Sequence, residues 1–200
     1  MYVRTRPQDR VQVLLTEQDA QALEAQWHQY EDDKPQISPR PEHVLAPVRN
    51  ALHKQFGRPP SEHDVLWRVF SDELVSFISS ESWSLYTHVL FEMAELQLMQ
   101  RRETAALDLY VQAVHLASNG PRNIDRELVR AGYSRFSAPG VVPDSYLQRL
   151  IKAQRALGLS PKQLEVMYLD AATRASTELK LPLAAESTWR SLGKRIAHDA

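Results

Sequence analysis

Apolar residues along this chain recur at intervals of three and four positions, the period of an amphipathic α-helix. The segment 83–99 departs from this pattern, because its apolar residues surround most of the helical cylinder. A helix that is apolar nearly all round belongs in the middle of a bundle. We therefore expect Trp83–Met99 to be the central element of the fold.

Capping residues, glycines and prolines set the boundaries of the other helices. Ser61 with Asp64, and Ser160 with Gln163, have the spacing of a capping box. The sequence predicts an all-α fold, an irregular multi-helix bundle of about eight helices. Apart from 83–99, the expected helical ranges are 16–30, 41–56, 61–78, 103–117, 124–131, 145–157, 161–179 and 183–197.

Two of these helices show a distinct apolar stripe, which predicts the face that each one buries. The stripe of the third helix consists of Leu66, Phe70, Leu74, Phe77 and Ile78. The stripe of the helix after Ser160 consists of Leu164, Tyr168, Ala171, Ala172, Ala175 and Leu179.

The N-terminal part holds the one predicted strand, Val11–Leu15, where apolar and polar residues alternate. A single short strand does not build a sheet, so we expect it to pair with another chain. We therefore divide the chain into a strand/helix-helix segment over residues 1–57 and a helical domain over residues 58–200. The alternative is that the whole chain forms one continuous domain. Pro47 should make the first turn of helix 41–56 irregular.

Composition narrows the classes of protein. The chain has 200 residues with 24 Lys and Arg, 25 Asp and Glu, and a formal net charge of −1. Such a chain has no overall field that attracts nucleic acid or an anionic membrane. Cysteine is absent, which fits a reducing cytosol, and no apolar run is long enough to span a bilayer. We expect a cytoplasmic protein that does not bind membranes.

The sequence contains no motif typical of catalysis, metal binding or cofactor binding. The seven histidines include no pair at i, i+4, and no zinc-binding pattern occurs. Glu62 and Asp64 flank His63, but acidic residues are expected in the first turn of a helix behind Ser61. We therefore predict no catalytic residues, no metal site and no cofactor, and the sequence favours a protein that is not an enzyme.

The predicted central hairpin carries four titratable residues in an apolar setting: His88, Glu92, Glu95 and His115. Both carboxylates are expected to reach the helix surface and pair with a cation such as Arg101 or Arg102. The histidines are expected to be hydrogen-bonded core or boundary residues. An enzyme that uses these carboxylates would be supported only if Glu92 or Glu95 lined a cavity.

Residues 119–123 and 133–143 lack any helical period, and loops carry function more often than helices do. Their arginine and aromatic residues are the candidates for contacts with a partner: Arg122, Tyr133, Arg135 and Phe136.

Residues 87–118 resemble a single tetratricopeptide-like helical hairpin. Ala94, Ala106, Tyr110 and Ala113 occupy the small and aromatic packing positions of that repeat. The resemblance implies a repeat-like hairpin and not a solenoid, since no second copy follows and an array needs about three. Within 83–142, the stretches 83–86, 93–95, 119–123 and 138–142 are also similar to an uncharacterised bacterial protein family.

Two further stretches resemble DNA-binding modules. Residues 10–56 resemble a ribbon-helix-helix fold, in which Arg10 and Gln12 would face bases from a strand shared by a dimer. Residues 159–196 resemble the helix-turn-helix domain of bacterial response regulators. That resemblance implies a recognition helix that opens at 187–190, with Arg190, Lys194 and Arg195 near phosphates.

Two functions remain as hypotheses. The first is a helical protein-protein interaction or scaffold module without catalytic activity, which binds a protein partner or forms a homo-oligomer. The alternative is a DNA-binding regulator that uses the ribbon-helix-helix-like N-terminus or the helix-turn-helix-like C-terminus.

Overall fold

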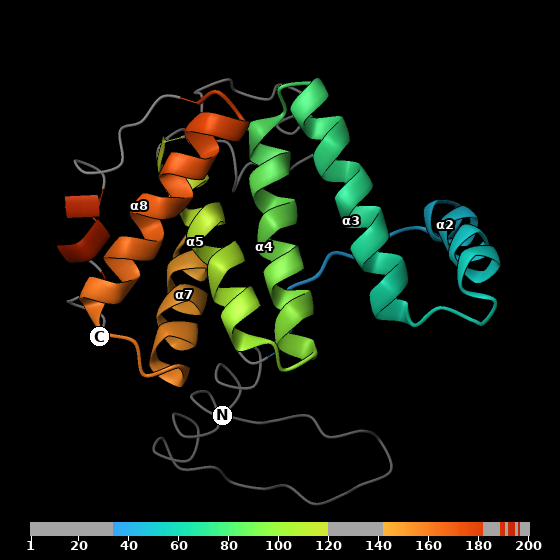
Figure 1. Cartoon of the computed structure of the whole chain (residues 1–200), viewed down its shortest axis with the longest axis horizontal. Helices are drawn as coiled ribbons and strands as arrows, with labels where there is room; N and C mark the ends of the chain where they lie inside the picture. Colours follow the sequence, from blue (N-terminus) through green and yellow to red (C-terminus); the bar gives the residue numbers. More distant parts are fainter. Residues whose placement is uncertain (1–33, 120–141, 182–188, 191, 195, 197–200) are drawn as a thin grey trace, which may run out of the picture. The chain divides into compact units, whose positions relative to one another are not determined.

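The computed structural model describes residues 34–119 and 142–181, together with residues 189, 190, 192–194 and 196 (Figure 1). The chain divides into two compact units, residues 1–35 and residues 36–200. The first unit is described only at Lys34 and Pro35. The other described residues belong to the second unit, which includes the helix 42–56 that was expected to be part of the N-terminal segment.

Helix α4 (Trp83–Met99) packs against both of its neighbours along the chain, α3 (Glu62–Ser79) and α5 (Glu103–Asn119) (Figure 1). Every residue of α4 from Val89 to Gln97 is buried. A helix without a polar face needs neighbours all round it, because each exposed apolar side chain would forgo its transfer free energy. The prediction that this helix is central is confirmed.

Tight turns connect α4 to both neighbours. Each link has three residues, and the middle one, Glu81 or Arg101, has a left-handed backbone with φ of 55°. The residue after each of these donates its main-chain N–H to a carbonyl five positions earlier. Ser82 donates to the Phe77 carbonyl at 2.9 Å, and Arg102 donates to the Gln97 carbonyl at 3.0 Å. These bonds satisfy carbonyls at the helix end and reverse the chain, so that α3, α4 and α5 run antiparallel.

Helix α3 begins with a complete capping box between Ser61 and Asp64, as the sequence predicts. Helix α2 (Glu42–Phe56) packs on α3 and contains Pro47. The expectation of an irregular first turn is wrong, because α2 is continuous through Pro47. The proline is exposed, so the carbonyl that lost its N–H partner faces the solvent side of the helix.

The buried face of α3 differs from its predicted stripe. Phe70 is buried, but Ile78 is 39% exposed, while Val65 and Val69 are almost fully buried. Both α2 and α4 contact α3, so the N-terminal half of α3 is enclosed on a wider arc than one stripe covers. The last turn, at Ile78, is left at the surface.

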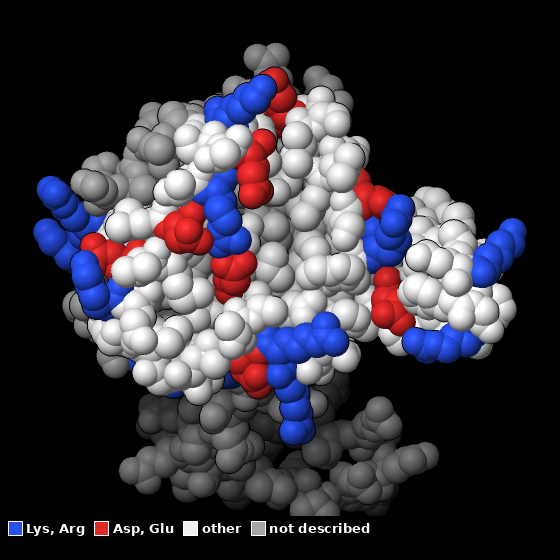
Figure 2. Space-filling model, in the orientation of Figure 1, with Lys and Arg blue, Asp and Glu red and all other residues white. Residues whose placement is uncertain are grey.

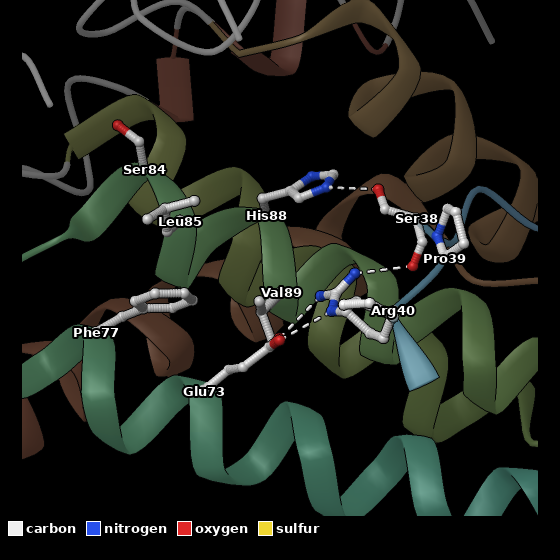
Figure 3. Close-up of a pocket in the computed structure, with 10 residues that line it drawn as sticks. Ser38, Pro39, Arg40, Glu73, Phe77, Ser84, Leu85, His88 and Val89 are labelled. Carbon is white, nitrogen blue, oxygen red and sulfur yellow. Dashed lines mark hydrogen bonds and ion pairs between the residues drawn. The ribbon is translucent and has the colours of Figure 1, made fainter. Parts of the chain in front are cut away.

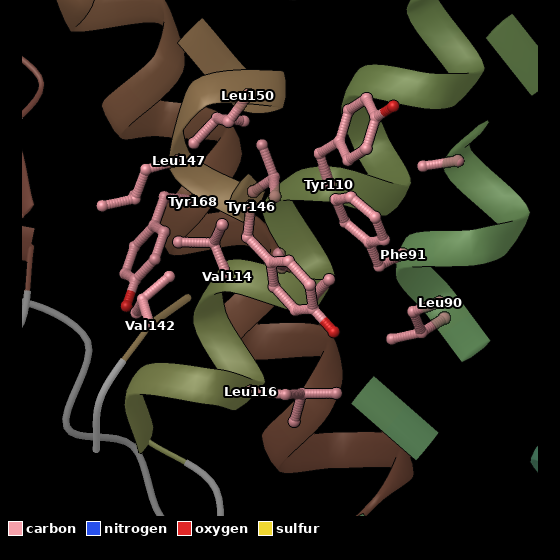
Figure 4. Close-up of a cluster of buried hydrophobic side chains, with 14 of the residues drawn as sticks. Leu90, Phe91, Tyr110, Val114, Leu116, Val142, Tyr146, Leu147, Leu150 and Tyr168 are labelled. Atoms are coloured by element: carbon pink, nitrogen blue, oxygen red, sulfur yellow. The ribbon is translucent and has the colours of Figure 1, made fainter. Parts of the chain in front are cut away.

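A larger apolar cluster lies on the other side of α4, where α5 meets α7 (Asp144–Ala156) and α8 (Pro161–Glu178). Phe91 of α4 stacks on Tyr146 of α7, with ring centroids 4.2 Å apart, and lies 5.5 Å from the ring of Tyr110 (Figure 4). The predicted stripe of α8 is buried from Leu164 to Ala175. The ring of Tyr168 extends this packing to Trp189, with the two ring centroids 5.0 Å apart.

The all-α prediction is confirmed for the described residues, which contain helices and no strand. They comprise six helices with complete bounds and helical positions between 189 and 196, seven in place of about eight. The predicted strand Val11–Leu15 and the helices 16–30 and 124–131 lie outside the described residues. In the part of the chain that is described, no helix has the length and apolarity to cross a membrane.

Helices α4 and α5 form the predicted central hairpin. Ala94, Ala106, Tyr110 and Ala113 are each 0% exposed. Small side chains let two antiparallel helices approach closely, which agrees with their assigned packing positions. The likeness to a tetratricopeptide repeat itself stays a prediction.

Candidate functional site

The segment Gln36–Arg40, here called the strap, is the most unusual feature of the described chain. Its backbone has no regular secondary structure, and prolines follow both Ser38 and Arg40. A residue before proline is held in extended conformations, and proline itself has no N–H to donate. The strap is therefore stiff, and its main-chain N–H groups need partners outside a helix or sheet.

Glu92 of α4 supplies one set of partners. Its side chain is 0% exposed and accepts a 2.7 Å hydrogen bond from the Ser38 main-chain N–H. Arg40 donates to the same carboxylate from Nη2 at 2.6 Å and from Nη1 at 3.2 Å. Arg40 also forms a two-point ion pair with Glu73 of α3, both bonds being 2.8 Å. One guanidinium thus joins the strap to two helices.

The charge of Arg40 is secured by these contacts. Burial acts to lower its pKa, but the hydrogen bonds and negative charges of Glu73 and Glu92 outweigh that effect, and the net pKa is raised. The guanidinium also lies 4.9 Å from the centre of the Phe70 ring. Such stacking adds a cation–π contribution to the ion pairs.

Glu95, one turn further along α4, binds a different set of groups. It accepts a hydrogen bond from the Gln36 main-chain N–H at 2.9 Å and one from the Tyr110 hydroxyl at 2.5 Å. Arg149 of α7 lies 3.1 Å away as an ion pair. Burial and the nearby Glu95 charge raise the pKa of Tyr110, which keeps its hydroxyl protonated as a donor. Glu95 therefore joins the strap, α5 and α7.

These positions correct the sequence-based expectation for both carboxylates. Neither Glu92 nor Glu95 reaches the surface, and neither pairs with Arg101 or Arg102, which are exposed at the end of the hairpin. The cations come instead from Arg40 and Arg149, which are distant in sequence. A carboxylate buried in an apolar helix needs such a partner, because an unpaired buried charge costs several kcal/mol.

A pocket of about 290 Å³ opens beside the strap. In Figure 3, Phe77 and Leu85 lie at one end, the strap residues lie at the other, and His88 is between them. The lining residues are Ser38, Pro39, Arg40, Pro41, Glu73, Phe77, Ser84, Leu85, His88 and Val89. Glu92 lies behind Arg40 and does not line this pocket, and neither does Glu95.

His88 is the titratable residue of α4 that faces the pocket. Its Nε2 lies 3.5 Å from both Ser38 Oγ and Glu92, and its Nδ1 lies 3.4 Å from the Tyr146 hydroxyl. Burial lowers its pKa, and the opposing effect of Glu92 is smaller. His88 is thus a neutral, boundary histidine at pH 7, as the sequence analysis expected, and it can exchange hydrogen bonds with a ligand.

His115 occupies a separate place in the apolar cluster, where its ring meets Tyr168 edge-on at 5.3 Å. Burial lowers its pKa to about 4. Asn119 lies within hydrogen-bonding distance of His115 Nδ1, at 3.2 Å. This histidine is a core residue, and it lines a small cavity of about 30 Å³ between α4, α5 and α8.

The other predicted contact residues fall mostly outside the described residues. Arg190 and Lys194 are described, and both are exposed. The candidate loop residues and the remaining candidate DNA contacts are not described: Arg122, Tyr133, Arg135, Phe136, Arg10, Gln12 and Arg195. Among the described side chains, no group of three or more metal-binding residues comes together.

The sequence analysis did not single out Arg40 or Glu73. One signal pointed to Arg40: it stands between two prolines in a loop whose extended backbone presents it as a fixed group. Comparisons with known proteins give no further guide to the site, since no protein-family model, no curated protein and no solved structure matches this chain.

Proposed function

We propose that this protein is a non-catalytic helical interaction module, and that it binds a protein partner through the pocket beside the strap. The observation that carries the proposal is the pocket itself, about 290 Å³ with an apolar end and a polar end. Ligand pockets for drug-sized molecules span roughly 300–1,000 Å³. This one lies at the lower limit, which suits a single anchoring side chain of a partner.

The polar groups around the pocket support recognition better than chemistry. All five N–H groups of Arg40 are engaged, with Glu73, Glu92 and the Ser38 carbonyl. The two buried carboxylates of α4, Glu92 and Glu95, do not line this pocket. A rigid pocket loses little entropy on binding, which favours a modest but specific interaction.

Part of the surface of α3 also favours a protein partner. In Figure 2, basic and acidic side chains intermingle over α5 and α8, whereas the surface over α3 and α4 is largely uncharged. Val75 and Ile78 of α3 are 66% and 39% exposed. Exposed apolar residues of this kind occur at interaction surfaces.

The test is a peptide-display selection against the full chain, followed by affinity measurement. Peptides that bind the wild type should lose at least tenfold in affinity, about 1.4 kcal/mol, for Ser84→Phe, which fills the pocket. Thr177→Phe, on the exposed side of α8, is the control and should leave binding unchanged, because Thr177 does not line the pocket. Peptides that are insensitive to Ser84→Phe, or a selection that yields none, would contradict the proposal.

Self-association is the second part of this proposal, because a partner is either another protein or a second copy of this chain. Sedimentation velocity over a wide range of concentrations separates the two. A concentration-dependent dimer that Ser84→Phe dissociates would identify the partner as a second copy. A monomer at all concentrations would leave a different protein as the partner. A cytoplasmic location is proposed with it, supported by the absence of cysteine.

A DNA-binding regulator is the second candidate, and one observation favours it. Arg190 and Lys194 are both exposed and four residues apart, so they lie on one helical face, as phosphate contacts would require. A protein that contacts several phosphates loses affinity steeply as salt rises. DNA binding at low salt with such a slope, weakened by Arg190→Ala, would support this candidate, and no binding at low salt would eliminate it.

A further inference from the structure

The buried charges beside the pocket do not balance within the described residues. Two carboxylates, Glu73 and Glu92, share one guanidinium group, that of Arg40. His88 adds no compensating charge, since burial lowers its pKa and keeps it neutral at pH 7. Counted over Arg40, Glu73 and Glu92, the cluster has one more negative than positive charge, which in a partly buried site acts on a ligand more strongly than it would in water.

Glu73 is the carboxylate through which that charge reaches the pocket. It lines the pocket and its side chain is 24% exposed, whereas Glu92 is 0% exposed behind Arg40. Arg40 bonds to both oxygens of Glu73, yet a carboxylate has about four lone-pair sites. Each oxygen of Glu73 can therefore accept a further hydrogen bond from a ligand.

An anionic ligand has little to bind in the same pocket. Arg40 is the one cation among the lining residues, and each of its five N–H groups is already directed at Glu73, Glu92 or the Ser38 carbonyl. An anion would have to displace one of these bonds and approach two carboxylates. Like charges at short range disfavour such an approach.

The apolar end of the pocket completes the pattern. Phe77, Leu85 and Val89 form a wall next to Glu73 (Figure 3). A long basic side chain can lay its methylene groups along such a wall and keep its charged head at a polar group. The arrangement of Figure 3 has both parts, with Glu73 at the edge of the wall.

From this geometry we propose that the pocket binds a lysine or arginine side chain of the partner, with the aliphatic part on Phe77, Leu85 and Val89 and the charged head on Glu73. This inference rests on the proposed function, because it names the chemistry of the partner's anchoring residue. Ser84 and His88 add hydroxyl and imidazole groups at the rim that can bond the partner's polar atoms.

The test uses three capped pentapeptides that differ only in the central residue, which is lysine, norleucine or glutamate. Norleucine has the apolar chain of lysine without its charge. Binding to the full chain is followed by shifts of the main-chain NMR signals of Leu85 and His88. We expect lysine to bind on the order of tenfold more tightly than norleucine, the effect of one charge-assisted hydrogen bond, and glutamate to bind least.

A pair of variants assigns the effect to Glu73. Glu73→Gln keeps an acceptor for Arg40 but removes the charge, and it should abolish the preference for lysine while norleucine still binds. Asp72→Asn removes the neighbouring carboxylate of α3, which is exposed and paired with Arg68, and should leave the preference intact. Thermal unfolding of both variants checks that they are folded.

Each other outcome overturns the inference in a recognisable way. Equal binding of the lysine and norleucine peptides would refute the basic anchor but leave the pocket as an apolar docking site. Tighter binding of the glutamate peptide would reverse the inferred charge. If none of the peptides shifts the signals of Leu85 and His88, the pocket is not a docking site and the proposed function fails with the inference.

Discussion

Glu92 and Glu95 lie one turn apart on the same helix and are equally buried, yet they are bound in different ways. Glu92 is held by Arg40 of the strap, which also binds Glu73, and this arrangement forms the wall of the pocket. Glu95 does not line the pocket; it is held by Tyr110 and Arg149 of the neighbouring helices and by the Gln36 N–H at the start of the strap. One buried carboxylate thus shapes a binding site, while the other mainly stabilises the packing of helices.

Removing the guanidinium group that Glu73 and Glu92 share should cause the largest loss of stability. In Arg40→Ala, two carboxylates lose their shared cation and Glu92 stays buried without its charge partner. We expect a loss of about 3–5 kcal/mol in the free energy of unfolding, together with loss of peptide binding at the pocket. Urea denaturation followed by circular dichroism measures the first quantity.

Arg49→Ala is the matched control, because Arg49 also contacts two carboxylates, Glu42 and Glu62, but on the exposed surface. Its effect on the unfolding midpoint should be small, as for other surface ion pairs. If the two variants lose the same stability, burial of the Arg40 cluster is not what makes it important.

The contacts of Glu95 can be weakened without changing a residue that lines the pocket. Tyr110→Phe removes the hydroxyl that donates to Glu95 and leaves the aromatic ring in place. The expected loss is about 1.5–3 kcal/mol in the free energy of unfolding, the range for a hydrogen bond to a charged group. Peptide affinity should not change, since Tyr110 does not line the pocket. A variant that lost peptide affinity without losing stability would contradict the division of roles between the two carboxylates.

His115 of α5 is a titratable core residue, and it should make the stability of the protein depend on pH. Its pKa is about 4 in the folded protein against 6.5 for an unperturbed histidine. Below pH 6.5 the unfolded chain binds the proton first, so stability present above that pH is lost as the pH falls toward 4. At pH 5 the loss from this group is about 2 kcal/mol.

His115→Gln removes this proton-linked loss. The measurement is the change in unfolding free energy between pH 7.5 and pH 5 for the variant and for the wild type. The change should be about 2 kcal/mol smaller in the variant, whatever its stability at pH 7.5. Identical pH profiles would show that His115 is protonated as readily in the folded chain as in the unfolded one.

The turns at the two ends of α4 should produce the smallest effect. Arg101 adopts a left-handed backbone at φ 55°, a conformation that costs a non-glycine residue about 1 kcal/mol. Arg101→Gly should therefore raise the free energy of unfolding by about 0.5–1 kcal/mol. Gly158→Ala is the reverse control, since Gly158 has φ of 63° and open space around its Cα, and it should lose a similar amount. In thermal denaturation the two variants should shift the melting temperature in opposite directions. Shifts in the same direction would contradict this explanation of the turns.

Local signals in the sequence were sufficient to predict most of the described helices. Ser61 and Ser160 fixed helix starts, because a capping box depends only on residues three positions apart. The all-round apolarity of Trp83–Met99 identified the central helix, since burial acts on each residue of that segment. The stripe of α3 was partly wrong because α2 widened its buried face, which depends on tertiary packing.

The candidate site was much less predictable. Glu92 and Glu95 were recognised as carboxylates in an apolar helix, but their partners were sought nearby in sequence, at Arg101 and Arg102. The actual contact between Arg40 and Glu92 spans 52 positions, and the ion pair of Arg149 with Glu95 joins α7 to α4. No local pattern specifies which distant cation meets a buried acid, because that choice is made when the helices pack.

The most direct test of this account is amide hydrogen exchange at Gln36 and Ser38, one for each carboxylate. Both residues lie in a segment without regular secondary structure, and their N–H groups donate to Glu95 and Glu92 at 2.9 and 2.7 Å. The account predicts that both amides exchange far more slowly than those of an unstructured peptide, at rates approaching those of α4. Exchange at the rates of an unstructured peptide would show that the strap is not fastened to α4, and would contradict the site built on it.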